Sequence, residues 1–261
     1  MCLSLLSHQR TEHPNATEFE RHCHTEFELL FVLHGRGDFI VEGTRYPLRD
    51  GTLLFTRPQE YHYVRPEADV PYERYVVNFD RAFPVGAAAE LPILSVRDTP
   101  GDGIYCKSET VIKPLRQAYA LIDQLAGAGT EVQETAARSA ITQTLLLLFL
   151  QGPDHESASG DKTVSAAIDY INNHLTEELS LDRLAGALYT SKYHLCRTFR
   201  EHTGTPILHY INTKRMTLAV QLLRDGIPAG EVALQIGFRD YSSFYRRFLC
   251  LTGKSPAQFQ Q

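Results

Sequence analysis

The sequence predicts an α+β protein of two domains: an N-terminal β-barrel with a helical arm, and a C-terminal domain made only of helices. The first observation is a series of short β-rich segments within residues 19–80. The second is a change to helical spacing of apolar residues after residue 108. The third is an element that occurs twice within residues 181–256. A chain of 261 residues is long enough for two domains of ordinary size.

The barrel is expected within residues 1–107. Residues 27–64 read FELLFVLHGRGDFIVEGTRYPLRDGTLLFTRPQEYHYV, in which runs of β-forming residues are closed by glycine or proline. The EGTR segment at 42–45 is typical of a hairpin turn. Short strands at such close spacing favour a small barrel or a sandwich.

The helical arm is expected at residues 108–151, where apolar residues recur at three- and four-residue spacing. Gly127 and Gly129 would separate its two helices. The arm either covers the barrel or mediates dimerisation, and its pattern fits both roles. The polar segment GPDHESASGDK at 152–162 is typical of a linker. A second domain is therefore expected at 163–261.

The repeated element explains the C-terminal domain. LCRTFREHTGTP at 195–206 and FYRRFLCLTGKSP at 244–256 both carry Arg, then Phe two residues later, then Thr-Gly and Pro. Ala185 and Ala233 take equivalent places before them, where a small residue lets two helices cross closely. Each copy therefore predicts a helix-turn-helix, at 181–201 and 229–250. The six helices are expected at 164–175, 181–188, 191–201, 206–223, 229–236 and 241–250.

The spacing of the two copies is compatible with binding to DNA. The helix expected at 206–223 would join them, and eighteen residues extend about 27 Å at 1.5 Å per residue. Two recognition helices could then lie about one DNA turn, roughly 34 Å, apart. The competing interpretation is a plain helical bundle. The hydroxyl and arginine side chains expected on the second helix of each copy favour DNA, because they suit phosphate oxygens and guanine edges.

The C-terminal residues also resemble a known family. EVALQIGFRDYSSFYRRFLCLTGKSPAQF at 231–259 and ILHYINTKRMTLAVQLL at 207–223 are similar to the tandem helix-turn-helix domain of the AraC/XylS family of bacterial transcription regulators. The resemblance implies base contacts by Tyr193, Cys196, Arg197, Ser242, Tyr245 and Arg246, and phosphate contacts by Ser191, Lys192 and Ser243. Cys196 departs from the family pattern, in which a longer polar residue is commoner.

A second candidate site lies in the N-terminal part. HCHTEFELLFVLHG at 22–35 and GTLLFTRPQEYH at 51–62 resemble the two cupin motifs, which implies a cupin-like barrel. His22, His24 and Glu28 share one strand parity and therefore one face, and His62 would join them. These residue types can bind a divalent metal, hydrogen-bond a small molecule in a pocket, or simply line the barrel mouth. Our candidates for effector binding are His22, His24, Glu28, His62, Tyr46 and Tyr75.

Composition excludes several classes of protein. No apolar run is long enough to cross a bilayer, and the first residues lack the features of a secretory signal. Five scattered cysteines without a CxxC pair indicate free thiols in a reducing cytoplasm. The net charge is −5, but residues 163–261 hold 11 basic against 8 acidic residues. A basic C-terminal part on an acidic body fits a polyanionic partner.

The function expected from these observations is that of a cytoplasmic regulator of transcription. Its barrel would sense a small molecule, with sugars as one class suggested by the resemblance, and its two helix-turn-helix motifs would read adjacent major grooves. The expected partners are double-stranded DNA, an effector, RNA polymerase and a second copy of the chain, with no membrane. We expect no enzymatic activity, no cofactor and no resident metal. The alternative is a cupin-type metalloenzyme with a helical appendage, which would not need the repeat.

Overall fold

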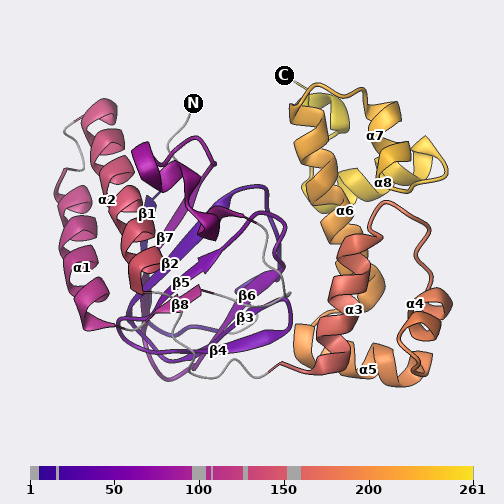
Figure 1. The fold of residues 1–261 in the computed structure, drawn as a ribbon, viewed down its shortest axis with the longest axis horizontal. Coiled ribbons are helices and arrows are strands. Elements are labelled where there is room, and N and C mark those ends of the chain that lie inside the picture. Colours follow the sequence, from indigo (N-terminus) through magenta and orange to yellow (C-terminus); the bar gives the residue numbers. More distant parts are fainter. Residues whose placement is uncertain are drawn as a thin grey trace.

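The computed structural model describes residues 6–15, 18–95, 104–106, 108–125, 129–151 and 160–260. The N-terminal half forms two β-sheets with two helices on their far side, and the C-terminal half is a separate group of helices beside the sheets (Figure 1). The predicted α+β class is therefore confirmed. None of the helices in these ranges is both long and apolar enough to span a membrane.

The strands form two antiparallel sheets. The larger has the order β1-β7-β2-β5-β8 and the smaller the order β4-β3-β6. The strands are β1 (Leu6–Thr11), β2 (Phe27–His34), β3 (Gly37–Val41), β4 (Thr44–Leu48), β5 (Leu53–Thr56), β6 (His62–Pro66), β7 (Tyr72–Phe79) and β8 (Ile104–Cys106). Val41 pairs with Thr44, which confirms the hairpin turn expected at EGTR.

A small barrel or a sandwich was expected, and the strands in the described ranges form two facing sheets rather than a closed barrel. An apolar layer that includes Leu30 from the larger sheet and Phe39 from the smaller one fills the space between them. Segment 18–26 runs past the open side in irregular conformation, and it pairs with β6 only at the bridge between His22 and His62. One paired position is too little to continue a ladder, so the sheets stay separate.

The alternation of side chains along β2 defines the layers. Phe27, Leu29 and Phe31 face α1 (Glu109–Gln124) and α2 (Thr130–Gln151), and they belong to the core cluster that includes Tyr119. Glu28 and Leu30 face the smaller sheet instead. The two helices thus cover the outer face of the larger sheet (Figure 1). Gly127, expected between the helices, lies outside the described residues.

The C-terminal helices match the predicted pattern closely. They are α3 (Lys162–Asn173), α4 (Leu181–Ala187), α5 (Lys192–Thr203), α6 (Ile207–Arg224), α7 (Ala229–Gln235) and α8 (Tyr241–Thr252). Residues 152–159 of the expected linker lie outside the described residues. The last part of that linker, however, is the start of α3, whose first turn is capped by the Asp161 side chain.

Candidate nucleic-acid interface and effector site

The first helix-turn-helix consists of α4 and α5. Leu184 and Ala185 on α4 and Leu195 and Phe199 on α5 are buried in one core cluster, which fixes how the two helices cross. Ser191 begins α5 by accepting a hydrogen bond from the backbone nitrogen of His194 at 3.2 Å. The predicted contact residue Ser191 therefore also has a structural task.

The opposite face of α5 is open to solvent. Lys192, Tyr193 and Arg197 are exposed, Tyr193 to 76%. Lys192 forms an ion pair with Asp182 at 2.8 Å, and Arg197 forms one with Glu201 at 3.0 Å. Such exposed pairs are weak, so both cations are available to a phosphate or a base. Cys196 differs, because it is half-buried against the core cluster.

The second helix-turn-helix consists of α7 and α8 and repeats this arrangement. Phe244 and Phe248 are buried, whereas Ser242, Tyr245 and Arg246 are exposed; Ser243 is half-buried. Asp240 caps α8 by accepting a hydrogen bond from the backbone nitrogen of Ser243 at 2.8 Å. This bond lowers the pKa of Asp240. The structure thus places all nine predicted DNA-contacting residues on, or at the first turn of, α5 and α8.

In the N-terminal half, four of the six predicted effector residues converge. One ligand-type atom from each of His22, His24, Glu28 and His62 lies within 4.8 Å of all the others. His24 Nε2 is 3.2 Å from a Glu28 carboxylate oxygen, and His62 Nε2 is 3.6 Å from the other. Glu28 and His62 are buried, His24 is half-buried and His22 is exposed. The cluster therefore extends from the interior between the sheets to the surface.

The remaining nitrogens of the three rings are also held. The Nδ1 atoms of His22, His24 and His62 lie 2.8, 2.9 and 2.8 Å from backbone carbonyl oxygens of Glu20, Glu26 and Glu60 respectively. The accepting residue lies two positions before His22 and His62, but two positions after His24. Hydrogen bonds to nearby backbone thus hold all three imidazoles in the cluster.

The charges of the cluster are coupled. Burial alone would raise the pKa of Glu28, but His62 and His24 outweigh it and hold that pKa well below its usual range. Burial alone would likewise lower the pKa of His62, and the Glu28 carboxylate raises it instead. For His22, desolvation and the neighbouring His62 lower the pKa. Glu28 is therefore an anionic group that faces three imidazoles.

Tyr46 and Tyr75 do not join this cluster. Tyr46 is buried in the apolar layer between the two sheets. Tyr75 lies on the outer face of the larger sheet, where its ring is 5.4 Å from Tyr119 and its hydroxyl donates to the Asp123 carboxylate. Tyr75 and Glu28 are on opposite faces of the sheet, because Tyr75 pairs with Phe31 on the alternate parity of β2.

A buried polar contact between the two halves was not expected from the sequence. Glu42, in the turn between β3 and β4, is 3% exposed and accepts hydrogen bonds from the Tyr61 backbone nitrogen and the Tyr210 hydroxyl. Lys214 of α6 forms an ion pair with the same carboxylate at 2.6 Å. Burial raises the pKa of Tyr210, so the hydroxyl keeps its proton and donates.

The sequence gives one usable signal for this contact. The turn needs left-handed backbone at both central positions, with φ of 50° at Glu42 and 77° at Gly43. A Cβ at Gly43 would lie 2.9 Å from Val164 of α3, so the turn fits closely against the helical domain. Glutamate is an unusual residue for such a turn, and that anomaly marked a position with a further task.

Segment 22–26 makes a further contact with the helical domain. Cys23 Sγ lies 3.1 Å from the Thr217 hydroxyl of α6, and burial raises the pKa of this thiol to about 11. Arg224, at the end of α6, donates to the Thr25 hydroxyl at 2.9 Å and to Glu26 at 3.2 Å. A cavity of about 790 Å³ lies between this segment and α6, and its lining includes His22, His24, Thr213 and Arg224.

Comparison with known proteins identifies the two domains. A family model described as an AraC-like ligand-binding domain matches residues 10–150, and one described as a helix-turn-helix domain matches residues 184–261. The HTH-type transcriptional activator RhaS of Salmonella arizonae is 25% identical over 245 residues, which cover 93% of this chain and 88% of that protein.

Solved structures give similar matches. The DNA-binding domain of AdpA in complex with a target DNA is 30% identical and covers 36% of this chain and 86% of that one, with a TM-score of 0.35. ToxT from Vibrio cholerae is 12% identical and covers 98% of this chain and 96% of that one, with a TM-score of 0.42.

The ligand-binding family model alone spans more than half of the chain, and the helix-turn-helix model covers the repeated element. The chain therefore belongs to the AraC family and is a DNA-binding transcription regulator with an N-terminal ligand-binding domain and a C-terminal helix-turn-helix domain.

Proposed function

We propose that α5 and α8 enter two successive major grooves of one duplex. Tyr193, Cys196 and Arg197 on α5, with Ser242, Tyr245 and Arg246 on α8, would contact bases. Ser191, Lys192 and Ser243 would contact phosphates near the helix N-termini. The observation that supports this proposal is the presence of two equivalent, solvent-exposed, arginine-bearing helices held apart by the eighteen-residue helix α6.

The effector would act through the contact between the two halves. A ligand in the N-terminal domain changes DNA binding only if it has different affinities for two arrangements of the molecule. Segment 22–26 and the Glu42 turn are suited to this role, because each joins the sheets to α6 through specific polar contacts. Effector binding near His22 and His24 would alter the first of these contacts directly.

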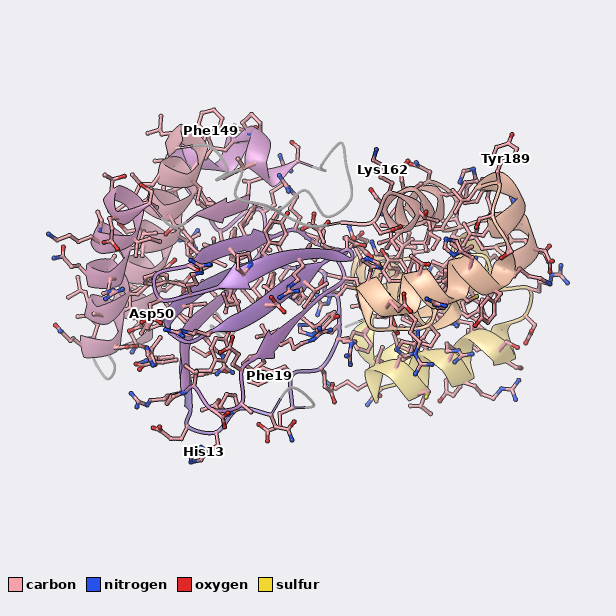
Figure 2. All side chains as sticks on the ribbon, turned by 90° about the horizontal axis from the view of Figure 1, so that it is seen from below. His13, Phe19, Asp50, Phe149, Lys162 and Tyr189 are labelled. Carbon is pink, nitrogen blue, oxygen red and sulfur yellow. The ribbon has the colours of Figure 1, made fainter. Side chains whose placement is uncertain are left out.

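A homodimer would place two such chains on paired half-sites and multiply their affinity. Apolar side chains on the arm support an interface there: Leu121, Val132, Phe149 and Leu150 are all more than 40% exposed. Phe149 points outward at the edge of the molecule (Figure 2). Because RhaS is described as a transcriptional activator, contact with RNA polymerase, and hence a place in the cytoplasm, is part of this proposal.

The first experiment selects the preferred DNA sequence from a random pool and then measures the binding of variants to it. Arg246→Ala should weaken specific binding by about 1–3 kcal/mol and relax the preference at one position. Arg197→Ala should do the same about one helical turn of DNA away. Arg247→Ala, at the adjacent exposed position of α8, is the matched control and should leave the sequence preference unchanged.

The outcome that contradicts the proposal is equally defined. If Arg246→Ala weakens binding to selected and random DNA by the same factor, Arg246 contacts phosphate rather than a base. If the selected DNA shows a base preference within only one major-groove segment, α5 and α8 do not read successive grooves.

A further inference from the structure

We propose that His22, His24, Glu28 and His62 bind one divalent transition-metal ion, and that segment 22–26 relays its presence to the helical domain. The first part stands on the geometry of the four side chains alone. The second part rests on the proposed function, because it requires that the helical domain binds DNA.

The ligand set has the composition of a metal centre. Three imidazole nitrogens and one carboxylate oxygen converge from two separate stretches of chain, with their ligand atoms within 4.8 Å of one another. Imidazole and carboxylate together suit zinc, iron, manganese, cobalt and nickel. Metal–ligand distances near 2 Å allow four atoms at this separation to surround one ion after a small inward movement.

The hydrogen bonds of the rings fix the tautomer that a metal requires. Each Nδ1 is within 2.9 Å of a backbone carbonyl oxygen, which can only accept, so each Nδ1 carries the proton. In the neutral ring, Nε2 then presents its lone pair to the cluster. Histidines that bind metals are typically held by such a second hydrogen bond, and here all three have it.

One of these nitrogens has no hydrogen bond within the described part of the chain. His62 Nε2 is fully buried, and the Glu28 oxygen at 3.6 Å is within ion-pair range but beyond hydrogen-bond length. A buried polar atom without a partner is costly and rare in native structures. A metal ion at the centre of the cluster would satisfy this nitrogen and the Glu28 carboxylate together.

The competing explanation is a simple ion pair between protonated His62 and Glu28. Together with the contact of His24 Nε2 to the other Glu28 oxygen at 3.2 Å, it accounts for three of the four residues. It gives no reason for His22 to face the same point, with its ring centroid 4.6 Å from that of His62 and 5.6 Å from that of His24. Protonating His22 as well would place several like charges together, which is unfavourable. One divalent ion explains all four orientations.

The position of the cluster connects it to α6. His22 and His24 both line the cavity between the two halves, so a bound metal would have a coordination position open toward that cavity. The residues between and after them contact α6: Cys23 meets Thr217, and Thr25 and Glu26 meet Arg224. Fixing the two histidines therefore also fixes the residues that hold α6.

The test uses the full-length chain with any affinity tag removed, stripped with a chelator and then titrated calorimetrically with Zn²⁺ or Co²⁺. We expect one ion per chain. His22→Ala and His24→Ala, at the more exposed positions, should each weaken binding by at least about tenfold. His34→Ala is the matched control, because His34 is exposed and pairs with a single carboxylate, Asp50, at 3.0 Å. It should leave affinity unchanged.

Cys23→Ser separates this site from adventitious thiolate binding, because Cys23 faces Thr217 rather than the cluster. The Cys23→Ser variant should still bind the metal. The visible absorption spectrum of its Co²⁺ form should show no thiolate-to-metal band. The absence of stoichiometric binding, or equal affinity in wild type and the His22→Ala/His24→Ala double variant, overturns the site.

A second measurement tests the relay. Binding to the selected DNA is compared with and without Zn²⁺, in wild type and in His24→Ala. A metal-dependent change of at least about threefold in wild type, absent in His24→Ala, supports the relay, because coupling between sites is usually several-fold. If metal binds but the affinity for DNA stays unchanged, the proposed relay is wrong and the proposed metal site still stands. Metal binding without any DNA binding contradicts the proposed function instead.

Discussion

The two helix-turn-helix units have the same internal design but different surroundings. The apolar cluster of the first unit includes Tyr61 and Cys23 of the N-terminal half, packed with Phe199 and Tyr210. In the second unit, the cluster described around Phe244 and Phe248 contains no residue before Met216. The first unit is thus built onto the ligand-binding domain, whereas the second has a core of its own.

This difference shows how one repeated motif can serve two tasks. Any movement of the N-terminal domain would change the packing of the first unit's core, because residues of that domain form part of this core. The second unit is connected to that domain less directly, through α6, the contacts of Arg224 and the ion pair between Arg239 and Glu178. We therefore expect the effector to act mainly on how α5 is presented to DNA, with α8 reading its groove in either state.

The largest effect is expected from the buried ion pair beside the first unit. Lys214→Met leaves the Glu42 carboxylate in an apolar site without its cation, since both side chains are at most 4% exposed. Losing one member of a buried pair typically lowers the free energy of unfolding by about 3–5 kcal/mol. Urea unfolding of the full-length chain measures this change.

The control is the double variant Glu42→Gln/Lys214→Met, which removes both charges and should recover most of the loss. A loss below about 1 kcal/mol for Lys214→Met alone would contradict the comparison. It would mean that the two halves separate easily and that water solvates Glu42.

The second effect concerns the turn of the second unit. Gly237 has φ of 82°, and a Cβ there would lie 2.7 Å from the carbonyl oxygen of Thr176. Gly237→Ala should therefore lower the free energy of unfolding by about 1–3 kcal/mol. Gly230→Ala on α7 is the control, because a Cβ there meets nothing within 4 Å. Equal effects of the two substitutions would contradict this explanation.

Much of the helical domain could be predicted from the sequence, because its signals are local. The repeated Arg-x-Phe and Thr-Gly elements fix the helices, and the expected range 241–250 compares with Tyr241–Thr252 observed. Capping at Ser191 and Asp240 follows from residue type as well. Whether the two sheets close into a barrel could not be predicted, because closure depends on pairing between distant strand edges, and alternation within a strand does not report that.

The candidate site shows the same limit. His22, His24 and Glu28 were expected on one face of a single strand, but only Glu28 lies in β2. His22 and His24 belong to the irregular segment 18–26, which brings them beside Glu28 and His62. Tyr75 was grouped with them although it faces α1 and α2. The sequence shows that side chains alternate between the two faces of a strand. It does not show which of these faces packs against the smaller sheet and which against the helices. Glutamate in the hairpin turn indicates that position 42 has a further role, but no local pattern identifies Lys214, far away in the chain, as its partner.

A smaller effect is expected at the first unit's turn. Tyr189 takes the place of Gly237, with φ of 51°, and its side chain is 98% exposed and points away from the molecule (Figure 2). Tyr189→Gly should relieve left-handed strain, offset in part by a more flexible unfolded chain, and stabilise by about 0.5 kcal/mol. Tyr189→Ala is the control, because it removes the side chain but keeps the strain. Equal unfolding midpoints for the two variants would mean that loss of the Tyr189 side chain, and not relief of backbone strain, causes the change in stability.

The smallest effect separates the two recognition helices by pH. Asp240 caps α8 and Ser191 caps α5, and only the aspartate titrates. The hydrogen bond from Ser243, helped by Arg246, holds the pKa of Asp240 below its ordinary value. The charged cap therefore stabilises the folded state fully above the pKa of the unfolded chain, and this stabilisation is lost as pH falls through the lower, folded pKa.

Below about pH 4, the amide proton resonance of Ser243 should shift, whereas that of His194 should not follow this titration. Asp240→Asn keeps a capping side chain without a titrating group and should abolish the shift at Ser243. A shift that persists in Asp240→Asn would assign the titration to another acid and would remove this distinction between the two units.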